Sequence, residues 1–254
     1  MYQYDFKLNT GDKNVGTVYL PFEDCVKLPV LIYCHGWGGD RSLPAVLQLL
    51  LDKQIAIVSF DFYAGGDTGG DYAHMTYKRW KENLCDILAW VIDQTFADSE
   101  YIGCYSLSSG STAALRLAAE DNRIKFLISV GTCISSHIFM RTGGPSKWLA
   151  DNLELLLSGG TFEDFGLEFL VDTVSNAPIH TIQKIKCPTL FLQGMADNPY
   201  RRADAKLAYD LMRFENTSVT HIEIENGDHG LDNTVDEAAS ILIDWLDERG
   251  IMAG

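Results

Sequence analysis

The sequence is poor in basic residues and has no long apolar run. Its 254 residues include 20 lysines and arginines against 35 aspartates and glutamates, a formal net charge of −15. Nucleic acid and anionic membrane surfaces repel such a chain at long range, so we expect neither as a partner. No apolar run approaches the ~20 residues that a membrane-spanning helix needs. The acidic residues are scattered and form no tail, so their simplest role is solubility.

Signatures of metal sites, disulfides and secretion are also missing. The six cysteines show neither C-x-x-C nor histidine-linked spacing, so the sequence suggests no zinc site and no disulfide framework. Cys34, Cys104 and Cys133 lie in or beside apolar runs, and we expect them to be buried thiols. The first residues, MYQYDFKLNTGDKNV, lack the basic start and apolar core of a signal peptide. We therefore expect a cytoplasmic protein.

Short apolar runs alternate with amphipathic segments along the chain. Apolar residues at helical spacing from Trp80 to Val91 and from Ala238 to Trp245 predict helices that face a core. The predicted strands cover residues 29–33, 56–62, 101–106, 125–131, 189–193 and 219–225. This alternation predicts an α/β fold with a mostly parallel sheet flanked by helices, in a single domain over residues 1–254.

One segment, residues 135–180, breaks the alternation. It contains two glycine pairs and two apolar stretches with helical character, and it is too long for an ordinary connection. We expect a small helical lid insertion over one end of the sheet.

The passage from Tyr101 to Ala119 runs from an apolar strand through small residues into an alanine-rich helix. A nucleophile elbow has this context, because the nucleophilic serine sits on a tight turn between a strand and a helix. Ser108 fits best, since Ser106-x-Ser108-x-Gly110 has small residues on both flanks and a helix start directly after. Ser106 as nucleophile would put the turn inside the strand. The motif alone is equally compatible with a serine-rich helix N-terminus.

Two further segments supply partners for a serine nucleophile. An apolar strand ending at Gly194 is followed by Asp197, and a later strand is followed by His229 between two glycines. A core histidine would not need such a loop, so we predict that His229 is the general base and Asp197 its acid. Asp228 is the chief rival to Asp197, but neighbouring side chains point apart.

A glycine-rich loop, from His35 to Asp40, follows the strand at residues 29–33. Such a loop can bring backbone N–H groups close to a reacting carbonyl, and we predict an oxyanion hole formed by the N–H groups of Trp37 and Ser109. We expect His35, Tyr63 and Trp148 to contact the substrate. No residue pattern implies a metal or an organic cofactor.

These elements in this order resemble the α/β-hydrolase superfamily. The block FDFYAGGDTGG at residues 60–70, followed by Met75-Thr76, resembles the D-F-x-G-x-G-x-S-x-G and M-T pattern of the cinnamoyl and feruloyl esterase-like branch. Ser106 stands where the elbow has glycine, and its S-x-S spelling is similar to acyl-transferases that take fatty acyl groups from acyl carrier protein. The resemblance implies the triad Ser108, Asp197 and His229.

The predicted function is hydrolysis of small-molecule carboxylic esters with small apolar or aromatic acyl groups through an acyl-enzyme. An acyltransferase or thioesterase acting on fatty acyl thioesters is the alternative. A hydrolase fold kept as a non-enzymatic binding module is a third hypothesis. The oligomeric state is not readable from the sequence.

Overall fold

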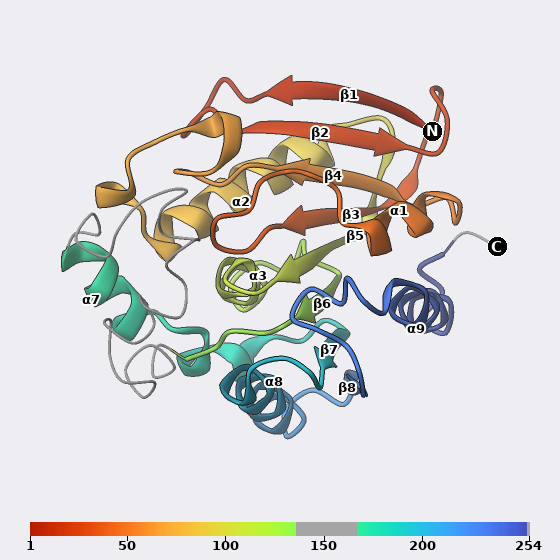
Figure 1. Ribbon diagram of the computed structural model, residues 1–254. Coiled ribbons are helices and arrows are strands. Elements are labelled where there is room, and N and C mark those ends of the chain that lie inside the picture. Colours follow the sequence, from red (N-terminus) through yellow and green to blue (C-terminus); the bar gives the residue numbers. More distant parts are fainter. Residues whose placement is uncertain (136–166, 253–254) are drawn as a thin grey trace.

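A single eight-stranded sheet forms the centre of the molecule, with strand order β1-β2-β4-β3-β5-β6-β7-β8 (Figure 1). The structure is a computed structural model that describes residues 1–135 and 167–252. β1 pairs antiparallel with β2, and β2 with β4, whereas every other neighbouring pair is parallel. The strands are β1 (Tyr2–Lys7), β2 (Val15–Leu20), β3 (Leu28–Cys34), β4 (Ala56–Phe60), β5 (Ala97–Leu107), β6 (Phe126–Val130), β7 (Thr189–Gly194) and β8 (Val219–Ile224).

The predicted fold class is confirmed, and the six predicted strands are β3 to β8. Every residue of β3, β4, β6 and β7 is buried, as expected of parallel strands covered on both faces. The sequence analysis missed β1 and β2. β1 is an edge strand, and its residues are exposed or half-buried, so it carries no continuous apolar run.

Helices cover both faces of the sheet (Figure 1). On one face lie α1 (Ala45–Leu51) and α9 (Val235–Asp247), and on the other α2 (Tyr77–Ile92), α3 (Gly110–Ala118) and α8 (Pro199–Met212). Each face has its own apolar cluster, with Trp80 of α2 in one and Trp245 of α9 in the other. Both tryptophans pack in the core, as predicted.

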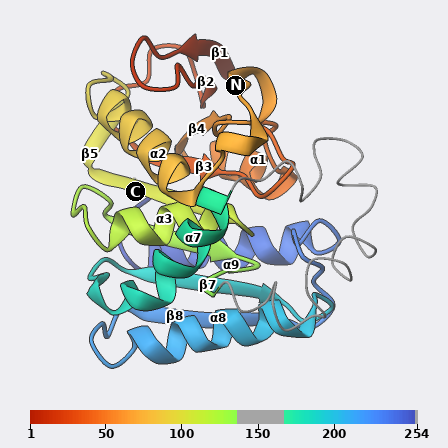
Figure 2. The ribbon, with the colours of Figure 1, turned by 90° about the vertical axis from the view of Figure 1, so that its left-hand side faces the viewer.

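The described part of the predicted insertion contains helix α7 (Leu167–Ser175) and one short 3-10 turn, η4 (Pro178–His180), and a second turn, η5 (Ile182–Lys184), follows it. Figure 2 shows α7 in front of α3 and beside α2. Asp172 holds α7 there: its carboxylate accepts the Lys78 N–H at 2.9 Å and lies 3.4 Å from the buried guanidinium of Arg116. The role of this segment as a lid stays a prediction.

Two further features concern the burial of the cysteines and the length and apolar character of the helices. Cys34, Cys104 and Cys133 are buried, as predicted, and all six cysteines are free thiols. Within residues 1–135 and 167–252, no helix combines the length and the apolar character needed to cross a membrane.

Candidate active site

Ser108 occupies the turn between the end of β5 and the start of α3. Its φ is +54°, a conformation that L-residues avoid unless the surroundings impose it. The backbone N–H of Ser108 donates to the carbonyl of Val130 at 2.9 Å, which fixes the turn to the end of β6. A strained serine between strand and helix is the geometry of a nucleophile elbow.

The two residues that flank Ser108 in the motif, Ser106 and Gly110, differ in their surroundings. A Cβ at Gly110 would lie 2.3 Å from the carbonyl oxygen of Cys34, so only glycine lets α3 start this close to β3. Ser106 lies within β5, fully buried, and its hydroxyl donates to the carbonyl of Ile128 at 3.2 Å. The structure therefore places Ser108 in the turn and Ser106 in the sheet.

Two side chains brace the loop that follows β6 beside the elbow. The Ser111 hydroxyl donates to the carbonyl of Ser108 at 2.5 Å and accepts the Cys133 N–H at 2.9 Å. From α8, the carboxylate of Asp204 accepts the N–H groups of Ile134 and Ser135 at 3.0 and 3.1 Å. Burial raises the pKa of Asp204, although these hydrogen bonds oppose the shift.

Asp197 and His229 meet as the sequence predicts. Oδ2 of Asp197 lies 2.8 Å from Nδ1 of His229, so a proton on Nδ1 donates to the carboxylate and leaves Nε2 as the basic nitrogen. Oδ2 also accepts from Gln193 at 3.1 Å, and Oδ1 accepts the Asn198 N–H at 2.6 Å. Burial alone would raise the pKa of Asp197, but the hydrogen bonds and the charge of His229 lower it below its ordinary value. The carboxylate is therefore ionised at neutral pH.

Asp228, the alternative to Asp197 as partner of His229, makes a different hydrogen bond. Its Oδ1 accepts the N–H of Asp232 at 2.8 Å, a contact inside the loop that carries His229. The acid that reaches the imidazole is thus the one from the neighbouring strand end.

The glycine-rich loop after β3 passes directly beside the elbow. A Cβ at Gly36 would meet Cβ of Ser108 at 3.0 Å. Ser109 is the N-cap residue of α3, and in the described part of the chain its N–H has no acceptor. The side chain of Trp37 is half-buried and packs edge-on against Phe169 of α7, with ring centroids 5.8 Å apart.

The predicted substrate contact of His35 requires correction. His35 is 1% exposed, its Nδ1 lies 2.7 Å from the carbonyl of Gly36, and its Nε2 accepts the Phe62 N–H at 3.0 Å. Both ring nitrogens therefore lie within hydrogen-bond distance of backbone atoms, so the imidazole supports the loop instead of facing a substrate.

The other two predicted substrate residues differ in what the structure says of them. The guanidinium of Arg79 stacks on the ring of Tyr63, with Cζ of Arg79 3.4 Å from the ring centroid. The Tyr63 hydroxyl accepts the Asp71 N–H at 3.0 Å. Tyr63 thus serves packing in the loop after β4. Trp148 lies outside the described residues, as do Phe139, Met140 and Phe165.

Sequence analysis missed Arg201, which reaches Ser108 from α8. Its Nη1 donates to Oγ of Ser108 at 3.0 Å. Among the described residues, Ser108 and His229 form no direct hydrogen bond, and Arg201 is the partner of the hydroxyl. The available signal was local: Asn198 and Pro199 mark a helix start, which puts Arg201 in the first turn of a helix that follows Asp197.

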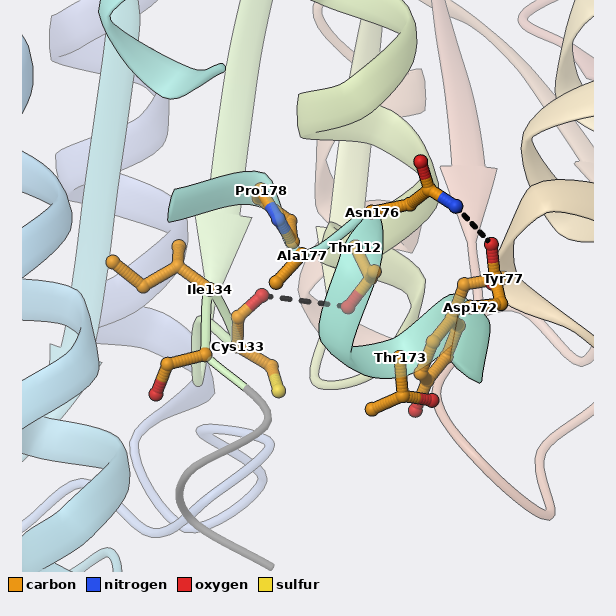
Figure 3. Close-up of a pocket in the computed structure, with 10 residues that line it drawn as sticks. Tyr77, Thr112, Cys133, Ile134, Asp172, Thr173, Asn176, Ala177 and Pro178 are labelled. Carbon is orange, nitrogen blue, oxygen red and sulfur yellow. Dashed lines mark hydrogen bonds between the residues drawn. The ribbon is translucent and has the colours of Figure 1, made fainter. Parts of the chain in front are cut away.

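A small cavity lies behind the elbow, between α7 and the loop after β6. Figure 3 shows Asp172, Thr173 and Asn176 on the α7 side and Thr112, Cys133 and Ile134 opposite. Its volume is about 10 Å³, which is room for about one water molecule. This space does not hold an acyl group. Among the described residues, no cluster of metal-binding side chains is found.

Known proteins are similar to this chain in sequence or in fold. An uncharacterized 31.7 kDa protein in the traX-finO intergenic region of Escherichia coli is 22% identical over 267 residues, covering 88% of this chain and 92% of its own. The α/β hydrolase GrgF from Penicillium sp. sh18 has 16% identity and a TM-score of 0.78, with 98% of this chain and 99% of its own covered.

Two further solved structures are similar. The 2,6-dihydroxy-pseudo-oxynicotine hydrolase has a TM-score of 0.72 at 20% identity over 96% of this chain, which spans 66% of that protein's chain. Est1E from Butyrivibrio proteoclasticus, solved with ferulic acid, has a TM-score of 0.68 at 17% identity, covering 94% and 98%. At these identities the likeness shows the α/β-hydrolase fold, not a branch within it.

The family is shown by a match over most of the chain. Residues 41–249 fit the prolyl oligopeptidase family, Peptidase_S9, and this range contains the elbow, the acid and the histidine. The chain therefore belongs to the prolyl oligopeptidase family and is a serine hydrolase of the α/β-hydrolase kind.

Proposed function

We propose that the protein is a serine esterase in which Ser108 is the nucleophile, His229 the general base and Asp197 the acid that orients it. The observation that carries the proposal is the 2.8 Å contact between Asp197 and His229 beside a strained serine elbow. Nδ1 is held by the carboxylate, so Nε2 is the nitrogen available to accept a proton.

The reaction has two steps. The Ser108 hydroxyl turns from Arg201 to the imidazole, Nε2 takes its proton, and Oγ attacks the ester carbonyl. The tetrahedral intermediate then breaks its bond to the alcohol, which leaves with the proton from Nε2. Water repeats the attack on the acyl-enzyme and releases the acid and free Ser108.

The N–H groups of Ser109 and Trp37 stabilise the oxyanion in this scheme. Ser109 is at the N-terminus of α3, where the partial positive charge of the helix adds to the donor. Loss of one oxyanion donor typically costs about 100 to 1,000-fold in turnover. Side-chain substitution does not remove a backbone donor, so this role is tested through the shape of the loop.

The half-buried ring of Trp37 on the glycine loop supports a small acyl group with an apolar stem. It packs edge-on against Phe169 of α7, which is buried. Apolar and aromatic walls with few polar groups are typical of small-molecule sites.

The nucleophile is tested with a p-nitrophenyl ester and two serine variants. Ser108→Ala is expected to lower hydrolysis by more than about 10⁴-fold, because Ser108 is the residue in the strained turn of the elbow. Ser106→Ala is the matched control and is expected to retain activity, since its hydroxyl faces the sheet. The opposite pattern would move the nucleophile, and a folded protein that a fluorophosphonate probe does not label would refute the esterase.

The family match supports a second candidate, a peptidase with the same three residues. A panel of oxygen esters, thioesters and aminoacyl p-nitroanilides with matched acyl groups distinguishes the candidates. Faster turnover of the oxygen esters supports the esterase, faster turnover of anilides the peptidase, and faster turnover of thioesters a thioesterase.

A further inference from the structure

Arg201 places a positive charge directly on the proposed nucleophile. The residue lies in the first turn of α8, and its half-buried side chain extends until Nη1 is 3.0 Å from Oγ of Ser108. The fold does not require a cation beside a serine hydroxyl. Burying a guanidinium group costs free energy unless an anion compensates its charge. The contact therefore needs a functional reason.

The described residues place no carboxylate in an ion pair with this cation. Within residues 1–135 and 167–252, Arg201 forms no ion pair, and Ser108 is its hydrogen-bond partner. Asp204 is the acidic residue one turn further along α8, but its oxygens accept from Ile134 N, Ser135 N and Ser135 Oγ. The adjacent Arg202 points elsewhere and donates to the carbonyl of Met195 at 3.1 Å.

The charge of Arg201 is felt across the site. Burial raises the pKa of the Cys133 thiol to about 11, and the positive charge of Arg201 opposes that rise. Burial also raises the pKa of Tyr77, and the positive charge of Arg201 opposes this rise as well. The charge of Arg201 also opposes the rise in the pKa of the buried Asp204, so it acts on several groups around Ser108.

We propose that Arg201 binds a carboxylate carried by the substrate, so that the preferred esters have a free acid group close to the scissile carbonyl. This inference rests on the proposed function, because it assigns the substrate class of the same site. Once Oγ attacks, the acyl group occupies the position next to Nη1. A carboxylate about two to four bonds from the reacting carbon then meets the guanidinium fork, which suits planar, bidentate binding of a carboxylate.

A carboxylate fits better than a phosphate for reasons of charge. One guanidinium neutralises one negative charge, and a dianionic phosphate would leave a net negative charge beside the oxyanion that forms during attack. The substrate class is therefore the half-ester of a short dicarboxylic acid.

The test compares a half-ester with its neutral counterpart. Monomethyl and dimethyl succinate, and the corresponding glutarates, are hydrolysed by the purified full chain, and the acid released is measured in a pH-stat. The wild-type protein is expected to favour the half-ester in kcat/KM. Arg201→Gln is expected to lower kcat/KM for the half-ester about 10 to 100-fold, mainly through KM, because a charged hydrogen-bonded pair is lost. The diester should lose distinctly less of its kcat/KM than the half-ester, because it carries no carboxylate for Arg201 to bind.

Two further variants control the comparison. Arg201→Lys keeps the charge but not the fork and is expected to fall between wild type and Arg201→Gln. Arg213→Gln removes an exposed arginine from the end of the same helix and should leave both substrates unchanged. Thermal unfolding of each variant shows whether the fold is intact.

A labelling experiment separates failure of this inference from failure of the esterase. Monomethyl succinate is expected to slow fluorophosphonate labelling of Ser108 in wild type more than dimethyl succinate does, and Arg201→Gln should abolish the difference. Labelling without a difference would overturn the carboxylate site and leave the esterase standing. An equal loss for both esters in Arg201→Gln would also overturn it. A folded protein whose Ser108 is not labelled would refute both.

Discussion

The imidazole of His229 lies directly against the backbone of Gly131, the residue that follows β6. A Cβ added to Gly131 would be 2.6 Å from Cε1 of His229 and 2.8 Å from its Nδ1. The preceding residue, Val130, accepts the N–H of Ser108. One strand end therefore positions both the proposed nucleophile and the proposed base.

Gly131→Ala is expected to lower ester hydrolysis by about 100-fold, because the new methyl group displaces the imidazole by about 1 Å or more. Part of any stability loss comes from φ, which is +55° at Gly131. Gly250→Ala is the matched control: its φ is +63° and its added Cβ meets nothing within 4 Å. Steady-state rates and thermal unfolding of both variants are the measurements. Equal activity in the two variants would argue against this placement of His229.

Asp197→Asn is expected to lower kcat by about 10⁴-fold, since an amide no longer holds the imidazole in the required tautomer. Asp228→Asn should stay within about tenfold of wild type, because the asparagine oxygen can still accept the Asp232 N–H. Steady-state hydrolysis of a p-nitrophenyl ester measures both. A larger loss in Asp228→Asn would reassign the acid.

The buried His35 makes stability depend on pH. Burial lowers the pKa of His35 below 6.5. Between that lowered pKa and pH 6.5, the imidazole is mostly neutral in the folded protein and mostly protonated in the unfolded chain. The stability due to neutral His35 is present above pH 6.5 and is lost as the pH falls from 6.5 towards the lowered folded pKa. His221, whose pKa burial also lowers, has the same sign.

His35→Gln isolates this contribution, because the histidine at 221 remains in both proteins. We expect the difference in unfolding free energy between wild type and variant to shrink by up to about 1.4 kcal/mol per pH unit below 6.5. Urea denaturation at pH 5, 6 and 7 measures it. A difference that is constant across this range would show that folding leaves the pKa of His35 unchanged.

The buried pair of Arg116 and Asp172 fixes α7 to α3. Asp172→Asn is expected to cost about 3 to 5 kcal/mol, because it leaves a buried guanidinium without its counter-charge. Adding Arg116→Met removes that cation, so the double variant should be more stable than Asp172→Asn. Urea denaturation of the single and double variants is the measurement. Strictly additive losses would mean that the two side chains do not interact.

Local patterns were enough to predict most of the fold. The apolar runs of β3 to β8 are strand-length and bounded by turn residues, and both predicted helices carry their apolar residues at a 3.6-residue period. The edge strand β1, which is exposed or half-buried, lacks such a run, whereas β2 is mostly buried and was missed although its sequence, VGTVYL, is largely apolar. The elbow was also predictable, because a tight strand-to-helix turn needs small residues at fixed offsets from Ser108.

Spacing along the chain was sufficient to predict the strand and helix order, the turn at Ser108 and the candidacy of Asp197 and His229. Three contacts became visible in the folded protein alone: Asp197 rather than Asp228 bonds the imidazole, His35 is buried, and Arg201 reaches Ser108. Such contacts depend on which strand ends and helix starts lie side by side. Sheet order and side-chain direction fix that arrangement, and neither is written in the local spacing of residues.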